Sequence, residues 1–239
     1  DTKITIPTQV VRNGLRAVVS GGAIIGNLSV NFLPSNADIQ VDDVLITSGL
    51  GKLYPYGLPV ARITNINAEV TRITSGNENA KITIIAYESL TCSHCANFHK
   101  DVYPKLKKDY IDTGLVKIEF RHFPLDVAAF NAAKISQCHQ NKSLTILESL
   151  YSNQQVWVKG NTVEEVNNNL KEFLINEGFN INYENCINNK EIEDFVLNDR
   201  IEGTKNFKVN ATPTIIINNE KFEKTLNYKN LKKTLEKLI

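Results

Sequence analysis

This sequence lacks a large excess of either positive or negative charge. Its 27 lysines and arginines stand against 26 aspartates and glutamates, a formal net charge of +1. Proteins that bind nucleic acid or the surface of a membrane need a basic excess concentrated on one face. The lysine-containing stretches 105–108 and 229–233 alternate with apolar residues at helical spacing, which indicates solvated helix faces. We therefore expect no nucleic acid among the partners.

Long hydrophobic runs and methionine are also missing. No apolar run approaches the roughly 18 residues of a membrane span, so the sequence predicts no such span. The chain starts at Asp1 without a basic-then-apolar signal segment and contains no methionine, which suggests a processed form that has lost a targeting segment. Its 239 residues, 42% of them hydrophobic, suffice for the core of one large or two small domains.

Cysteine is scarce, but the spacing of the cysteines is informative. The four cysteines, Cys92, Cys95, Cys138 and Cys186, permit three pairings. Because the first two are so close in sequence, Cys92–Cys95 together with Cys138–Cys186 is the economical choice. One local and one distant pair are typical of an oxidising compartment.

The N-terminal part of the chain predicts a small all-β module. Short runs rich in threonine, valine and isoleucine alternate there with glycine and proline, and helical spacing is absent. Examples are ITIPTQVV, RAVVSGG, DVLITSGLG and GLPVARITNI. The polar stretch TSGNENA, residues 74–80, has no periodicity and indicates a linker. We therefore expect a β module over 1–74, a linker at 75–80 and a second domain over 81–239.

The second domain alternates strands and helices. KITIIAYESL predicts a buried strand, residues from Cys92 to Tyr110 carry apolar side chains at helical spacing, and LVKIEFRHF predicts another strand. Such a strand, helix, strand unit builds a parallel sheet. Residues 126–206 have helical patterns throughout, TPTIIINNEKFEKT predicts a hairpin, and residues 228–239 predict an amphipathic helix. We expect an α/β fold in which a helical block interrupts a small sheet.

The motif TCSHC carries the chemistry. A thiolate attacks disulfides, and a free cysteine with a pKa of about 8.5 is mostly protonated at neutral pH. Cys92 follows the strand and starts the helix, where unpaired N–H groups and the helix dipole favour a thiolate. His94 can add a hydrogen bond or a positive charge, and Ser93 a hydroxyl donor. Cys95, one turn deeper, is the expected resolving thiol, which closes the Cys92–Cys95 disulfide after a mixed disulfide has formed.

Other interpretations of the same residues stay open. A zinc site would use Cys92, Cys95 and histidines, but structural zinc sites usually have a second ligand pair, and the remaining candidates lie singly. We therefore favour redox chemistry and expect no metal. His99 is either an ordinary helix residue or a functional one. Cys138 and Cys186 form either a structural disulfide, worth roughly 4 kcal/mol for a loop of about 50 residues, or a second redox pair.

The order of these motifs resembles that of the DsbA-like thiol-disulfide oxidoreductases, a thioredoxin-fold family with a helical insertion. The resemblance covers residues 78–239 and rests on ITIIAYESLTCSHCANFH, on FRHFPLD before an alanine-rich helix, and on ATPTIIINNEKF before the last helix. It implies that Cys92 is the nucleophile and Cys95 the resolving thiol. It also implies a cis peptide at Thr212–Pro213, packed against the active disulfide, whose backbone pairs with an extended substrate segment.

The resemblance extends further and also has gaps. Some bacterial relatives carry a second, structural disulfide in the insertion, which would join Cys138 to Cys186. Proline often stands where this chain has Ser93, and a buried acid often stands where it has Ala86, with Glu88 two residues later. We therefore expect the redox potential and the proton transfer at the second cysteine to differ from those of the family.

The N-terminal module resembles the β domain of MreC, a periplasmic cell-shape scaffold that self-associates. The likeness covers residues 5–66 and rests on IPTQVVRNGLRAVVSGG and FLPSNADIQVDDVLITSGLGKLYPYGLPVARIT. It implies no catalytic residue. Beside a redox domain, such a module implies docking or a homo-oligomer formed through residues 1–74, a dimer or a trimer with the trimer slightly favoured.

Together these features predict an exported bacterial thiol-disulfide oxidoreductase of the periplasm or another part of the cell envelope. Its substrates would be cysteine-containing exported proteins, a redox partner would reset the Cys92–Cys95 pair, and no cofactor besides that disulfide is needed. An oligomer brings several active sites to one substrate, which favours isomerase over simple oxidase activity. The alternative is an MreC-type periplasmic scaffold in which the thioredoxin-like domain is a binding module.

Overall fold

The chain folds into two compact units. The computed structural model describes residues 4–21, 28–31, 33, 37–64, 70–139 and 142–239. The units are Asp1–Glu69 and Val70–Ile239, and each is described by itself. The division lies before the stretch 74–80 that the sequence indicates as a linker, because Ile73–Ser75 is an edge strand of the second unit. In the part of the chain that the structure describes, no helix has the length and apolar character to cross a membrane.

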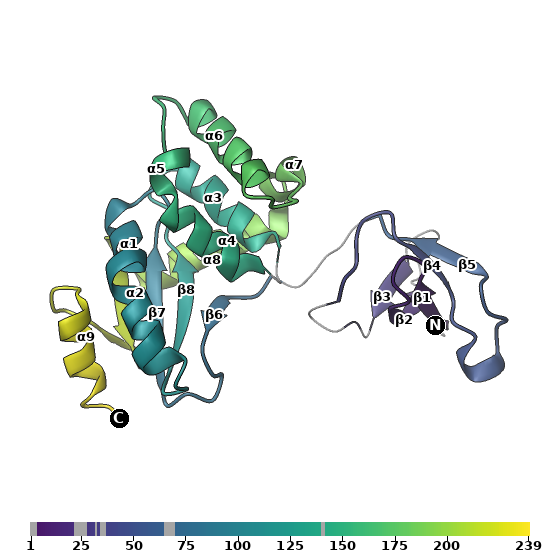
Figure 1. Ribbon diagram of the computed structural model, residues 1–239, viewed down its shortest axis with the longest axis horizontal. Helices are drawn as coiled ribbons and strands as arrows, with labels where there is room; N and C mark the ends of the chain where they lie inside the picture. The colour runs from purple at the N-terminus through teal and green to yellow at the C-terminus, as the bar shows by residue number, and fades with distance from the viewer. Residues whose placement is uncertain (1–3, 22–27, 32, 34–36, 65–69, 140–141) are drawn as a thin grey trace. The chain divides into compact units, whose positions relative to one another are not determined.

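The first unit is an antiparallel sheet with strand order β3-β2-β1-β4-β5, seen in Figure 1. Its elements are β1 (Thr5–Val10), β2 (Arg16–Gly21), β3 (Leu28–Asn31), β4 (Val44–Thr47), the short turn η1 (Leu50–Lys52) and β5 (Pro59–Arg62). Alternate residues of the strands point inward, and Val10, Val19, Leu45 and Ile63 form the core. Arg12 donates to both carboxylate oxygens of Asp43, at 2.8 and 2.9 Å. The expected all-β module is confirmed.

The second unit is built on a mixed sheet with strand order β10-β9-β7-β8-β6. Its strands are β6 (Ile73–Ser75), β7 (Ile82–Glu88), β8 (Val116–His122), β9 (Thr214–Ile217) and β10 (Glu220–Lys221). β7 and β8 run parallel, whereas β6 and β9 pair antiparallel with β8 and β7. Asn218 and Asn219 turn the β9–β10 hairpin with positive φ angles, which asparagine tolerates better than most residues.

The stretch expected as one helix from Cys92 to Tyr110 is interrupted by wider turns. It consists of α1 (Ser93–Asn97), the π-helical η2 (Phe98–Val102), α2 (Tyr103–Leu106) and the π-helical η3 (Lys107–Ile111). Pro104 has no N–H to donate, and its ring crowds the carbonyl of the preceding turn, so the hydrogen-bond ladder widens before it.

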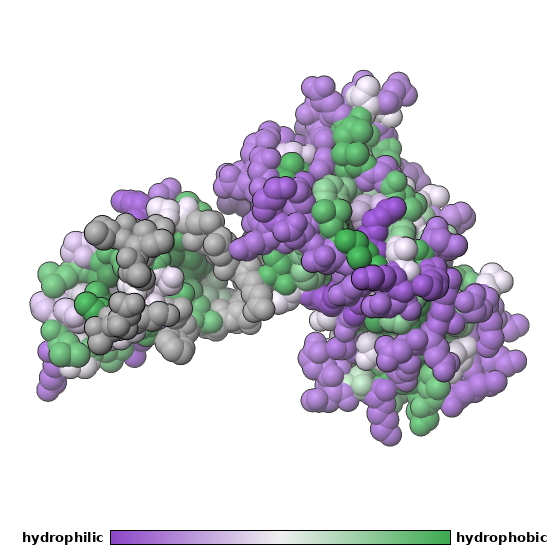
Figure 2. Space-filling model, turned by 180° about the vertical axis from the view of Figure 1, so that it is seen from behind, coloured by the Kyte–Doolittle hydropathy of each residue, from purple (hydrophilic) through white to green (hydrophobic). Residues whose placement is uncertain are grey.

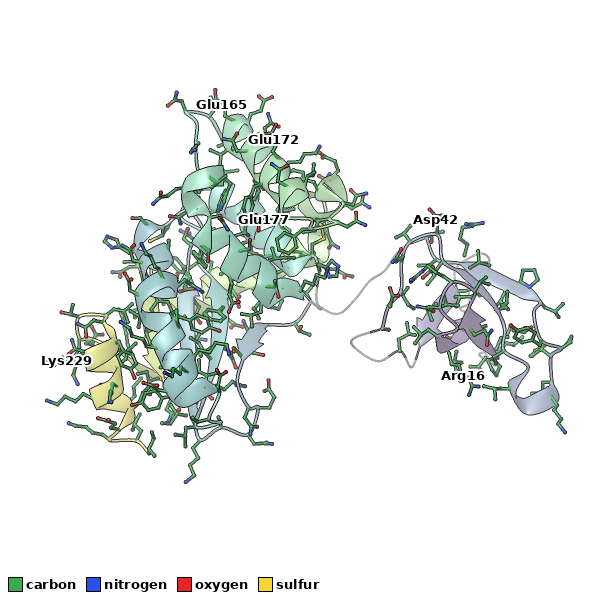
Figure 3. All side chains as sticks on the ribbon, viewed as in Figure 1. Arg16, Asp42, Glu165, Glu172, Glu177 and Lys229 are labelled. Atoms are coloured by element: carbon green, nitrogen blue, oxygen red, sulfur yellow. A yellow bond between two sulfur atoms is a disulfide. The ribbon has the colours of Figure 1, made fainter. Side chains whose placement is uncertain are left out.

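The remaining helices lie around the sheet and in the inserted block beyond it, as Figure 1 shows. They are α3 (Val127–Gln137), α4 (Ser143–Ser152), α5 (Gln154–Trp157), α6 (Val163–Asn176), α7 (Tyr183–Ile187), α8 (Lys190–Phe207) and α9 (Tyr228–Leu235). Charged side chains such as Glu172 on α6 and Lys229 on α9 project from the outside of this unit (Figure 3). The expected α/β sheet with a helical insertion is confirmed.

The two faces of β7 have different partners. Ile84 and Ala86 belong to the main core with α1 and α2, whereas Ile85 and Tyr87 face the other side. Gly203 of α8 lies against the ring of Tyr87, since a Cβ at that glycine would come within 2.7 Å of a ring carbon. Residues with even numbers along β7, including the last one, Glu88, therefore point toward the helix that starts after Cys92.

Candidate active site

The register of the sheet brings Cys92 to the Thr212–Pro213 turn. Tyr87 near the end of β7 pairs with Thr214 at the start of β9, so the segments beyond these two strand ends lie side by side. The Thr212–Pro213 peptide is cis. The thiol of Cys92 donates a hydrogen bond to the carbonyl oxygen of Thr212, with 3.4 Å between sulfur and oxygen.

Cys92 is half-buried and its thiolate is stabilised. Its backbone is extended, and the helix begins at the next residue. A hydrogen bond from the Cys95 thiol contributes most to lowering the pKa of Cys92 to about 5, against the opposing effect of burial. The Thr212 hydroxyl and the backbone N–H groups of Cys95 and His94 lower this pKa further.

Cys95 has the opposite character. It is fully buried, and burial raises the pKa of its thiol far above the ordinary value. The hydrogen bond to Cys92 and the charge of Glu88 act in the same direction. At neutral pH, Cys92 is therefore a half-buried thiolate and Cys95 a fully buried thiol.

Ser93 and His94 both have exposed side chains. In the described structure, neither side chain forms a hydrogen bond to Cys92. His94 acts on Cys92 through its backbone N–H instead, because it lies in the first turn of the helix.

A buried acid–imidazole pair lies behind the two cysteines. Glu88 Oε2 is 2.8 Å from His99 Nε2, and both side chains are almost completely buried. The ring of Tyr151 stacks on His99 with 4.1 Å between centroids. Among the described residues, Glu88 Oε1 and His99 Nδ1 have no hydrogen-bond partner. Glu88 points to the same face of β7 as Ala86.

The helical block holds the turn before Cys92. Gln154 Nε2 donates to the carbonyl oxygens of Leu90 at 2.7 Å and of Cys92 at 3.1 Å. Thr91 Oγ1 donates to Asp126 Oδ2 at 2.6 Å, and the other carboxylate oxygen of Asp126 caps α3. Sequence reasoning missed Gln154, because no local pattern connects it to the motif.

The other two cysteines lie apart from this site in sequence. Cys138 and Cys186 form a disulfide that joins the end of α3 to α7. Among the described residues no group of three or more histidine, cysteine, aspartate or glutamate side chains could hold a metal ion. His122 is buried, burial lowers its pKa to about 4, and its Nε2 lies 3.0 Å from Nε2 of Gln137.

Comparison with known proteins supports two separate likenesses. Residues 68–237 match a family model described as thioredoxin, and residues 1–91 match the model of the barrel core of the rod shape-determining protein MreC. The structure of alpha-DsbA1 from Wolbachia pipientis is similar with a TM-score of 0.63 and 30% identity, over 70% of this chain and 90% of that chain.

Curated proteins show both likenesses as well. A candidate protein-disulfide oxidoreductase of Rickettsia conorii is 25% identical over 191 residues, which are 79% of this chain and 67% of that protein. The cell shape-determining protein MreC of Escherichia coli is 40% identical over 72 residues, which are 30% of this chain and 20% of that protein. This chain therefore spans only a small part of the MreC protein.

Proposed function

Because the chain belongs to the thioredoxin family through residues 68–237, we propose that it is a DsbA-like protein thiol-disulfide oxidoreductase. Both resemblances expected from the sequence, including the one to the MreC barrel core, are confirmed. The observation that carries the proposal is the difference in burial and pKa between two cysteines that lie within one helical turn. Cys92 is half-buried with a pKa of about 5, and Cys95 is fully buried with a strongly raised pKa.

The chemistry follows from this contrast. A thiolate of a substrate protein attacks Sγ of Cys92 in the Cys92–Cys95 disulfide, and the electron pair of the broken bond leaves on Cys95. Cys95 takes up a proton, since its thiol form is strongly favoured there. A second substrate thiolate then attacks the substrate sulfur of the mixed disulfide and releases Cys92 as a stable thiolate. The substrate gains one disulfide, and the two cysteines of the enzyme are reduced.

Glu88 is the proposed source and acceptor of the Cys95 proton. Cys95 is closed off from solvent, so its proton must come from a group inside the protein. The negative charge of Glu88 contributes to the raised pKa of the Cys95 thiol. His99 forms a hydrogen bond with one oxygen of the Glu88 carboxylate, and the other oxygen has no hydrogen-bond partner among the described residues. The pair therefore combines a fixed position with an oxygen available for a proton.

The surroundings of Cys92 suit an unfolded polypeptide. Leu125 and Val127 flank Asp126, and both side chains are exposed, by 51% and 56%. Exposed apolar side chains beside a reactive thiolate bind the apolar segments of proteins that have not finished folding. We propose that the substrates are cysteine-containing exported proteins of the bacterial periplasm or envelope, and that a separate redox protein resets the active pair.

The β module supports the finer proposal of an oligomeric isomerase. The segment between β4 and β5 exposes Leu50, Leu53, Tyr56 and Leu58, and Figure 2 shows hydrophobic side chains on the surface of the module. Its outer strands β3 and β5 each have one edge without a paired strand in the described sheet. Both features favour association, either of copies of the chain or with another protein.

Two measurements test the proposal. Equilibration of the Cys92–Cys95 pair with glutathione should give a reduction potential between about −120 and −180 mV, typical of oxidases and isomerases. A potential below about −270 mV together with an unshifted Cys92 pKa would mean a reductant or an inert disulfide. Refolding of scrambled ribonuclease should be faster with the whole chain than with a chain starting at Val70, checked to be folded by circular dichroism. Equal isomerase activity would remove the role given to the module.

A second candidate is an MreC-type scaffold in which the thioredoxin unit only binds a partner. The match of residues 1–91 to the MreC barrel core favours it. This candidate predicts that Cys92→Ser leaves partner binding unchanged and that the Cys92 thiol has an ordinary pKa. The titration described above therefore separates the two candidates.

A further inference from the structure

The turn that leads to Cys92 is held by a buried amide from outside the sheet. Gln154 is 9% exposed and lies on α5, a helix of the inserted block. Its single side-chain nitrogen donates to two main-chain carbonyls, those of Leu90 and Cys92. Neither carbonyl belongs to a strand, and the mechanism above uses none of these groups.

The carbonyl of Cys92 is the start of the helix that stabilises the thiolate. It accepts hydrogen bonds from the backbone N–H groups of Cys95 and Ala96, both at 3.1 Å, in addition to the Gln154 amide. The N–H of Cys95 is also one of the groups that lower the pKa of Cys92. The orientation of this peptide therefore determines how well the first turn of α1 faces the sulfur.

The amide also contributes an electrostatic effect of its own. The N–H end of an amide dipole carries partial positive charge, and here that end points at the residue whose sulfur becomes negative. Burial strengthens such an interaction, because water does not compete for the donor. Gln155, the next residue, is exposed and offers a matched comparison.

We propose that Gln154 is a positioning residue for thiol–disulfide exchange, through which the helical block sets the reactivity of Cys92. This inference rests on the proposed function. A helix that is remote from Cys92 in sequence would then contribute to the reactivity of its sulfur, and the helical insertion would have a function at the active site.

The test compares Gln154→Leu, Gln154→Glu and Gln155→Leu in the full chain. The Cys92 thiolate is titrated by its ultraviolet absorbance, and the equilibrium constant with glutathione is measured in the same samples. We expect Gln154→Leu to raise the Cys92 pKa by about half a unit, the worth of one weak neutral hydrogen bond, and to change the equilibrium constant about threefold toward the disulfide. Gln154→Glu should raise the Cys92 pKa more. Its carboxylate faces two carbonyls without a donor and places a negative charge near the thiolate. Gln155→Leu should match the wild type.

The titratable groups near the sulfur, Cys95, Glu88 and Tyr151, are the same in all of these proteins, and only Gln154→Glu adds a further carboxyl. If both Gln154 variants keep the wild-type pKa and equilibrium constant while the urea midpoint falls, Gln154 is only structural and the proposal is overturned. Should Gln154→Leu fail to fold, Gln154→Asn, which keeps the amide but shortens its reach, is measured in its place with the same expectation. A wild-type chain without a lowered pKa or any exchange with glutathione would instead refute the proposed function itself.

Discussion

The carbonyl oxygen of Thr212 lies 3.4 Å from Sγ of Cys92, and the hydroxyl of the same threonine is buried with no partner among the described residues other than this sulfur. The thiol of Cys92 can donate to the carbonyl, but a thiolate cannot. The thiolate can accept from the hydroxyl, which contributes to the lowered pKa of Cys92. One residue thus has a group suited to each protonation state of the sulfur.

Thr212→Val should raise the pKa of Cys92 by about one to two units, because it removes one hydrogen bond to a charged group and keeps the shape of the side chain. The measurement is the thiolate absorbance as a function of pH. Thr204→Val, on the exposed side of α8, is the control and should leave the pKa unchanged. An unshifted pKa in Thr212→Val would show that the hydroxyl does not reach the sulfur.

The reduced protein should become more stable relative to the oxidised protein as the pH rises from about 5 to about 9. Folding lowers the pKa of Cys92 from the ordinary value of 9.0 to about 5, so this stabilisation is complete above the unfolded pKa and is lost as the pH falls through the folded one. Below about pH 8, Cys95 adds little, since it is protonated both in the unfolded chain, where its pKa is the ordinary 9.0, and in the folded chain, where burial raises its pKa. The Tm difference between reduced and oxidised protein measures the effect, and parallel pH profiles would contradict it.

Breaking the Glu88–His99 pair should cost more than replacing it. His99→Leu leaves a buried carboxylate without its partner and should lower the free energy of unfolding by about 3 kcal/mol or more. The double variant Glu88→Leu with His99→Leu should recover much of that loss, because two apolar side chains fit the aromatic surroundings. Urea unfolding checks both proteins. If the double variant is as unstable as the single one, the shape of the site rather than its charge decides the stability.

The same double variant should be slow in exchange at Cys95. It keeps Cys92 and its hydrogen bonds, but it removes the proposed proton donor of Cys95. Stopped-flow oxidation by glutathione disulfide should show a normal first step, the attack of Cys92, and a slower second step, in which the Cys95 thiol must lose its proton. Equal rates of both steps in variant and wild type would rule out Glu88 as the proton acceptor.

Removing the second disulfide should affect stability rather than redox chemistry. Cys138 and Cys186 are 48 residues apart, and closing such a loop is worth about 4 kcal/mol in the chain-entropy model. Cys138→Ala with Cys186→Ala should lower the free energy of unfolding by that amount in urea. The reduction potential of the Cys92–Cys95 pair should stay as in the wild type, and a clear shift would indicate that the second disulfide takes part in exchange.

Arg72→Met should destabilise the second unit. Its guanidinium pairs with the buried carboxylate of Asp199 and, at 3.1 Å, with Glu202. Removing the cation leaves Asp199 charged in the interior, at a cost of about 3 kcal/mol. Lys190→Met, which breaks an exposed pair with Glu193 on the same helix, is the control and should cost less than about 1 kcal/mol.

The sequence predicted the elements whose signals are local. Alternation and helical spacing indicated β7, α1 and the helices of the insertion, and the CxxC spacing indicated the reactive pair. The edge strand Ile73–Ser75 was not predicted, because the sequence assigned its residues to the end of the β module and to the linker, and three residues show no periodicity. The interruption of the helix was missed although Pro104 signals it, since the wider turns keep the apolar spacing nearly unchanged.

The support behind the reactive pair could be predicted only in part. Glu88 was identifiable, because period-two alternation places it on the same face of β7 as Ala86. Its partner His99 was considered and left open, since only the packing of Tyr151 and the burial of both groups distinguish it from a surface histidine. Gln154 gave no signal at all. A glutamine on a short helix has many possible partners, and the fold selects two carbonyls far away in sequence.

The position of β6 determines where force enters the second unit. This strand is at the edge of the described sheet, where it pairs only with β8, and Arg72, the residue just before it, forms an ion pair with Asp199 of α8. A pull on the chain ahead of Val70 therefore loads this short strand and its ion pairs first. Strand β7 leads to Cys92, and strand β9 follows Pro213. Both strands lie further inside the sheet. Under tension, we therefore expect β6 to detach from the sheet before the surroundings of the reactive sulfur change.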